Sequence, residues 1–323
     1  MTSLLTKNKI LLLIEILFLV LFILYLKYYV QWEELLINIK NSDKIYFLLS
    51  IFFYFLKNIT ESWKWKYISN TFNFNINFYT LLKYTCIAPF FSIISVFPKG
   101  EELYFFFMFK IKTHKSSTAV SMLIVNKSIG LISILLLLPF TLVYFYFFNF
   151  RIDINQKKIL QVIMLCVLFF MLLMAFILYF YRKKKIRIFI TKTIDQLKKN
   201  FNFFNRNPAY FILLLSLNYL NYIFYALTIY FICLSLEISI SLIFLFLSVP
   251  IIYLITFLTF TYKGLGTKEG AWSLMAFLFY VPLSKLHALT SLHFILSLFY
   301  IFIGFLLYFN NRKSNGASIS SFK

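Results

Sequence analysis

Long apolar runs constrain this chain more than any other feature of its sequence. An α-helix needs roughly 20 apolar residues to cross a bilayer. The chain is 323 residues long, 61% hydrophobic and only 13% charged, whereas a soluble domain carries about 25% charged residues. The runs that reach or approach a spanning length are 10–29, 44–62, 117–148, 159–181, 208–235 and 284–309. The sequence therefore predicts an all-α, polytopic helical membrane protein with about six to eight transmembrane helices.

Two further apolar stretches, 79–111 and 240–283, are interrupted near their middles. The first breaks at "FPKGEE" (97–102). The second breaks at "TYKGLGTKEGAW" (261–272), which holds three of the chain's seven glycines. Non-helical backbone at membrane depth is tolerated only where protein or a water-filled cavity surrounds it. We therefore expect two interrupted hairpins, re-entrant in the favoured topology and fully spanning in the alternative.

Basic residues indicate how the chain is oriented. The segment 182–206 carries nine basic residues and one acid, and short cytoplasmic loops are enriched in Lys and Arg. Lys7 and Lys9 place the N-terminus on the same side. The sequence predicts a multi-pass protein of the cell membrane with both termini in the cytoplasm.

The net charge of +21 does not indicate a nucleic-acid partner, because no soluble domain would present it. The three cysteines all lie within apolar runs and share no ligand spacing. We therefore expect no nucleic acid, no metal and no cofactor.

The two interrupted stretches resemble each other. Each is apolar, breaks at Gly, Lys and Glu, becomes apolar again, and is followed by a basic residue further along the chain. The matched residues are Lys99, Gly100, Glu101 and Lys127 in the first half, and Gly266, Lys268, Glu269 and His293 in the second. Hairpins that enter from opposite faces would make the halves an inverted repeat, an arrangement that many transporters use.

This repeat sets the predicted domain organisation. Residues 1–310 form a single transmembrane domain, with pseudo-repeats at about 44–148 and 208–309. The basic loop 182–206 joins them, and 311–323 form a short polar cytoplasmic tail.

The glycine-rich break predicts an anion site. Gly264 and Gly266 permit a sharp turn that leaves backbone amides free, and a helix beginning near Lys268 would direct its positive end into the cavity. A charge at mid-membrane costs about 2.5–3.5 kcal/mol to insert, so such charges rarely face lipid. An internal ion pair that only holds the hairpin together is the alternative explanation.

No catalytic constellation is found, so we expect a protein that is not an enzyme. The candidate residues for substrate binding or transport are Lys127, Lys268, Glu269, Glu101, Lys263 and His293, with Gly100, Gly264, Gly266 and Gly270 as backbone turns.

Several motifs resemble one known family. "GLGTKEGA" (264–271) resembles the Gly-Leu-Gly-x-Arg-Glu signature of the lysylphosphatidylglycerol synthase transmembrane region, also called the flippase-like family. "FPKGEE" is similar to its Pro-x-x-Gly-Glu element, and "WKWKYI" (63–68) to its Arg-Trp segment. The chain departs from the family pattern at Tyr104 and His293, where the family has Arg, and at Asn126–Lys127, where it has Glu-Arg.

The resemblance implies the transport module of this family without its soluble synthase domain. That module would be a lipid translocase that moves a phospholipid, an aminoacyl-phospholipid or a lipid-linked saccharide between leaflets. The anionic headgroup would bind Lys127 and Lys268 through its phosphate.

Two other functions remain open. A membrane-embedded transferase acting on polyprenyl-phosphate lipids would hold a divalent metal with clustered carboxylates, but the chain has only eleven acids and no Asp-x-Asp. A non-catalytic partner of a separate lipid-modifying enzyme or glycosyltransferase is the other alternative.

The Lys268 hypothesis leads to a first prediction. Lys268→Gln should abolish lipid transport, and Lys268→Arg should keep it because the charge and the hydrogen-bond donors remain. If Glu269 only neutralises Lys268, the double change Lys268→Gln with Glu269→Gln should restore transport, because it leaves no unpaired ion. A leaflet-resolved lipid assay in proteoliposomes measures all three, and normal transport by Lys268→Gln would reduce the motif to a structural hinge.

Overall fold

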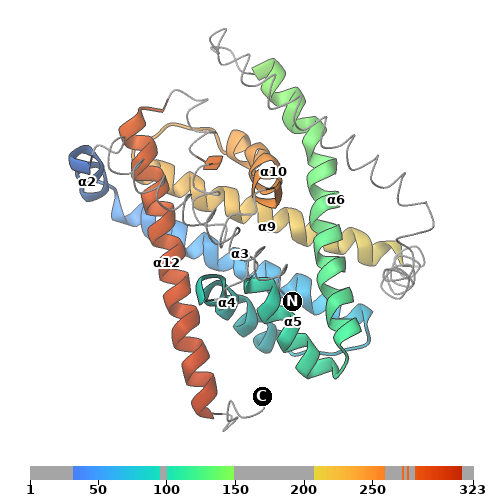
Figure 1. Ribbon diagram of the computed structural model, residues 1–323. Coiled ribbons are helices and arrows are strands. Elements are labelled where there is room, and N and C mark those ends of the chain that lie inside the picture. The colour runs from blue at the N-terminus through green and yellow to red at the C-terminus, as the bar shows by residue number, and fades with distance from the viewer. Residues whose placement is uncertain are drawn as a thin grey trace, which may run out of the picture.

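The computed structural model describes residues 32–94, 100–148, 207–258, 271–272, 275 and 281–314 (Figure 1). All regular structure within these ranges is helical, which confirms the all-α prediction. The helices are α2 (Trp32–Lys40), α3 (Lys44–Thr71), α4 (Phe78–Ile94), α5 (Gly100–Thr113), α6 (Ser116–Phe148), α9 (Pro208–Ser235), α10 (Leu242–Leu258) and α12 (Leu283–Ser314).

Three of the described helices, α6, α9 and α12, are long and apolar enough to cross a membrane. They coincide with the predicted runs 117–148, 208–235 and 284–309. The predicted runs 10–29 and 159–181 lie outside the described residues.

Helix α3 lies antiparallel to α9 along most of its length (Figure 1). At one end the Asp43 N–H donates to the Ser235 carbonyl at 2.9 Å. At the other end the rings of Tyr67 and Tyr210 meet edge to face, with centroids 6.1 Å apart. Both helices have 28 residues, so α3 accompanies α9 from end to end although its sequence is more polar.

The first two helices of each half have identical lengths. Helices α3 and α9 each have 28 residues, and the described parts of α4 and α10 each have 17. Each boundary in the second half follows its counterpart by the same offset, from 44 to 208, 71 to 235, 78 to 242 and 94 to 258. The same helical unit therefore occurs twice among the described residues.

The caps that end α3 and α9 are also the same. In each, the second residue after the helix has a positive φ, 62° at Asn73 and 55° at Glu237. The N–H of the next residue bonds back to a helix carbonyl, at 3.0 Å to Ser69 and at 2.9 Å to Cys233. This is the Schellman arrangement, which usually has Gly in the left-handed position. Two non-glycine residues adopt it here at matching places.

The long last helix of each half packs against the other half. Helix α6 lies against α10, where the Thr141 hydroxyl donates to the Leu247 carbonyl at 3.0 Å. Helix α12 lies against α4, and its Tyr300 hydroxyl donates to the Ile51 carbonyl of α3 at 2.7 Å. The two halves are thereby interlocked through their final helices.

The first interrupted stretch forms two short helices that pack together. Helix α4 has 17 residues and α5 has 14, on either side of 95–99. Residues 95–99 lie outside the described residues, so the re-entrant hairpin stays a prediction. The second break, 259–270, lies outside the described residues.

Gly304 allows the close approach of α12 to α4 and provides a second prediction. A Cβ at this position would lie 2.6 Å from the Cys86 carbonyl oxygen and 3.3 Å from the Ile87 Cα. Backbone atoms cannot move aside as a side-chain end can, so Gly304→Ala should destabilise the fold by about 1–3 kcal/mol.

The matched control is Gly130→Ala, because nothing lies within 4 Å of a Cβ at Gly130 in helix α6. This change should leave the stability equal or slightly higher, since Ala is the better helix former. Thermal unfolding of the detergent-purified variants measures both. Equal midpoints would contradict the close packing at Gly304.

Candidate functional site

Polar side chains gather where the middles of α3 and α9 meet. Lys57 and Asn221 are each the fourteenth residue of a 28-residue helix. They touch, since Asn221 Nδ2 donates to the Lys57 carbonyl at 3.0 Å. Because matching residues of two antiparallel helices meet at this point, the local two-fold axis that relates α3 to α9 passes between them.

An ion pair lies one to two turns further along α3. Lys64 Nζ is 2.7 Å from Glu61 Oε2 and donates to Asn218 Oδ1 of α9 at 3.0 Å. Asn221 Nδ2 lies 3.4 Å from the same Glu61 oxygen. The side chain of Lys64 is only 6% exposed, whereas that of Glu61 is 23% exposed. The ammonium is therefore enclosed, and the carboxylate keeps some access to the surface.

Lys57 adds a second cation. Its Nζ lies 4.6 Å from the centre of the Tyr54 ring, within the range of a cation–π contact. The carboxylates of Glu61 and Glu101 both interact with it electrostatically. We call Lys57, Glu61, Lys64, Asn218 and Asn221 the central polar cluster.

Tyrosines connect this cluster to the helices around it. The Tyr222 hydroxyl of α9 donates to the Gly130 carbonyl of α6 at 3.3 Å. The Tyr222 ring lies 5.2 Å from that of Tyr253 on α10, and both tyrosines interact electrostatically with Glu61. Tyr222 thus links α9 to α6 and α10 beside the central polar cluster.

The predicted candidate Glu101 lies beside this cluster. It occupies the first turn of α5, after the buried Gly100, and it is exposed. Its interaction with Lys57 brings the first interrupted stretch to the middle of α3.

Lys127 belongs to a different, more exposed pair. Its Nζ lies 2.6 Å from Glu102 Oε2, and the side chains are 41% and 38% exposed. Beside the pair, Glu102, Leu103, Phe106 and Leu123 line an open recess of about 310 Å³. The predicted cation is therefore held between α5 and α6, next to an apolar surface.

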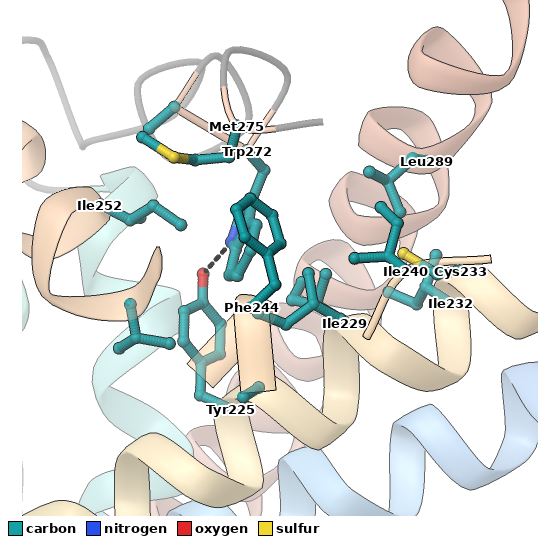
Figure 2. Packing of buried hydrophobic residues seen from close by; sticks show 14 of the residues in the cluster. Tyr225, Ile229, Ile232, Cys233, Ile240, Phe244, Ile252, Trp272, Met275 and Leu289 are labelled. Carbon is teal, nitrogen blue, oxygen red and sulfur yellow. Dashed lines mark hydrogen bonds between the residues drawn. The ribbon is translucent and has the colours of Figure 1, made fainter. Parts of the chain in front are cut away.

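His293 has another environment again. It is buried on α12, with its ring centre 6.0 Å from that of Tyr225. The Tyr225 hydroxyl accepts from Trp272 Nε1 at 3.0 Å, among the packed aliphatic side chains that Figure 2 shows. Lys127 and His293 thus differ in burial and in partners, and their shared role stays a prediction.

The remaining predicted residues lie outside the described residues. They are Lys263, Lys268, Glu269, Gly264, Gly266 and Gly270. Within the described ranges, no group of three or more His, Cys, Asp or Glu side chains could hold a metal ion.

The sequence reasoning missed the central polar cluster, although one local signal for it exists. Lys57, Glu61 and Lys64 are spaced at i, i+4 and i+7, which places three charges on one face of a helix. Trp65, beside them, is buried between Phe105 and Phe109 of α5, with ring centres 4.8 and 5.0 Å away. Lys64, Trp65 and Ile68 of the segment 63–68 are therefore internal, whereas Trp63 is exposed.

Similarity to known proteins agrees with the motifs. Residues 12–304 match the family described as the lysylphosphatidylglycerol synthase TM region. The chain belongs to this family. The resemblance noted at the Gly-Leu-Gly motif is thereby confirmed, and this member of the family is embedded in a membrane.

A curated relative is similar along most of its length. The UPF0104 membrane protein MJ1595 of Methanocaldococcus jannaschii is 25% identical over 315 residues, which cover 89% of each chain. No solved structure matches the chain.

The contact between Lys64 and Asn218 yields a third prediction. Asn218→Leu removes an acceptor from an enclosed ammonium, and a buried polar group that loses a partner costs about 1–3 kcal/mol. The thermal unfolding midpoint of the purified protein should fall. Asn75→Leu is the matched control, because Asn75 is exposed in the turn between α3 and α4. Equal midpoints for the two variants would contradict a stabilising role for this contact.

Proposed function

We propose that this protein is a lipid translocase that moves lipids with an anionic headgroup between the leaflets of the cell membrane. The observation that carries the proposal is the central polar cluster. It places charged and amide side chains at the middle of two antiparallel helices, one of which is apolar enough to span the bilayer.

Charge at this depth is a reason to infer transport. An ionisable side chain at the centre of a bilayer is costly and generally faces a bundle interior or an aqueous cavity, where it marks a substrate or ion pathway. Transporters built from repeated units hold substrate near the midplane, where the repeats meet. The contact between Lys57 and Asn221 is such a meeting point.

The chemistry of the cluster suits a phosphate. Lys57 and Lys64 supply positive charge, and Asn218 supplies a further donor. Asn218 Nδ2 is buried and makes no hydrogen bond of good geometry among the described residues, although the side chain interacts with Tyr222. A buried donor without a well-placed acceptor is unfavourable, and a phosphate oxygen would satisfy it.

The recess at Lys127 suits the approach of a lipid. Its apolar wall of Leu103, Phe106 and Leu123 would accommodate acyl chains, while Lys127 would attract the headgroup. We further propose that the break containing Gly264, Gly266, Lys268 and Glu269 contributes backbone and charge to the same pathway.

The family description supports the proposed substrate class. It names lysylphosphatidylglycerol, and we propose a phospholipid, an aminoacyl-phospholipid or a lipid-linked saccharide as the cargo. A separate lipid-modifying enzyme or glycosyltransferase would supply it, while this chain carries out no covalent chemistry. Both termini are proposed to lie in the cytoplasm.

Reconstitution provides the fourth prediction. Purified protein in phosphatidylcholine vesicles should move short-chain fluorescent phosphatidylglycerol between leaflets, followed by extraction with albumin. The double variant Glu61→Gln with Lys64→Gln keeps hydrogen-bonding side chains and leaves no unpaired ion. It should fold but transport lipid at least about tenfold more slowly. This decrease in rate corresponds to an increase of about 1.4 kcal/mol in the activation free energy of transport.

Lys44→Gln is the control, because it removes a lysine at the exposed start of α3. It should transport at the rate of the unmodified protein. Unchanged transport by the double variant would show that the central polar cluster only holds α3 and α9 together.

A further inference from the structure

The ion pair in the central polar cluster is neutral as it stands. Lys64 contributes one positive charge and Glu61 one negative charge, with Lys64 Nζ 2.7 Å from Glu61 Oε2. An anionic phosphate that entered this group would leave one negative charge in excess. Charges interact more strongly inside a protein than in water, so the excess would strongly oppose binding unless a proton entered as well.

Geometry selects the carboxylate that would accept this proton. Glu101 is exposed in the first turn of α5. Glu61 Oε2 lies 2.7 Å from Lys64 Nζ, and a phosphate that binds Lys64 would compete with Glu61 for the same ammonium. Glu61 is therefore the group that loses its counter-ion when the headgroup arrives.

We propose that Glu61 is a proton-binding site and that each anionic headgroup crosses together with one proton. This inference rests on the proposed lipid translocation and specifies what drives it. A pH gradient is the energy source that such a site would use.

The groups that face Glu61 are consistent with this role. On its own helix they are Lys57 and Lys64. From α9 Asn221 lies 3.4 Å from the carboxylate, and Tyr222 interacts with it electrostatically. From α10 Tyr253 does the same. Lys64 and Asn221 therefore hold the Glu61 carboxylate in place before the headgroup binds.

The step is a simple protonation. A proton from the adjacent aqueous side forms an O–H bond on a Glu61 carboxylate oxygen. The Lys64 ammonium keeps its protons, and its ion pair passes from Glu61 to a phosphate oxygen. No other covalent bond changes.

Protonation also alters a contact between the two halves. Asn221 belongs to α9, and its Nδ2 lies near the Glu61 oxygen of α3. Neutralising that oxygen weakens the attraction, because hydrogen bonds to charged groups are stronger than those to neutral ones. Loading the site thus loosens the α3–α9 seam at the point where the halves meet.

The fifth prediction is measured on the unmodified protein. Vesicles of phosphatidylcholine that contain a trace of short-chain fluorescent phosphatidylglycerol are given a gradient of one pH unit. With one proton per lipid, the label should concentrate about tenfold in the leaflet that faces the alkaline side, because one pH unit corresponds to a factor of ten. A pH-sensitive dye inside the vesicles should report proton movement that depends on the lipid.

Variants locate the proton. Glu61→Gln should lose the accumulation, so that the label it moves becomes evenly distributed between the leaflets. Glu61→Asp keeps a carboxyl group and should still concentrate it. Glu33→Gln removes an exposed carboxylate from α2 and is the matched control, with accumulation equal to that of the unmodified protein.

Each outcome decides the matter. If the unmodified protein moves the lipid under the gradient but distributes it evenly between the leaflets, proton coupling is overturned and the proposed translocation still holds. If Glu61→Gln still concentrates the label in one leaflet, the proton binds at another residue and the assignment to Glu61 is overturned. If the unmodified protein moves no lipid with or without a gradient, the proposed function itself fails. Should Glu61→Gln not insert, the dye signal of the unmodified protein and the result for Glu61→Asp still decide.

Discussion

Charged and amide side chains at membrane depth must be covered by protein, and this constraint explains the pairing of α3 with α9. Hydrocarbon offers no partner to an ammonium or a carboxylate, so the charged face of α3 has to meet another polar face. Helix α9 presents Asn218 and Asn221 at the matching height. The neighbouring helices α4, α6 and α10 then pack against α3 or α9.

Apolar runs predicted the helices that face lipid almost to the residue. Helix α9 begins at Pro208 and ends at Ser235, as the sequence indicates. Helix α3 was expected to end near 62 but continues to Thr71, because hydropathy measures the preference of each residue for solvent and not the presence of a partner helix. Lys64 and Asn218 are far apart in the chain and on different helices, so no local pattern could reveal their contact.

The repeat was also recognised from the sequence, but its register needs the helix boundaries. Matching the glycine-containing breaks aligned Gly100 with Gly266. That pairing stays a prediction, because 259–270 lie outside the described residues. Among the described residues, the starts of the helices and the shared caps at Asn73 and Glu237 align α3 with α9 and α4 with α10.

The interlocked final helices bear on how the chain is synthesised and assembled. Helix α4 is covered by α12, the last described helix to leave the ribosome, and α6 packs against α10 of the second half. The first half therefore enters the membrane with surfaces that its own sequence does not cover. Native packing of α4 has to wait until α12 has been synthesised, so the early helices must remain stable in lipid and still be able to rearrange when the later ones arrive.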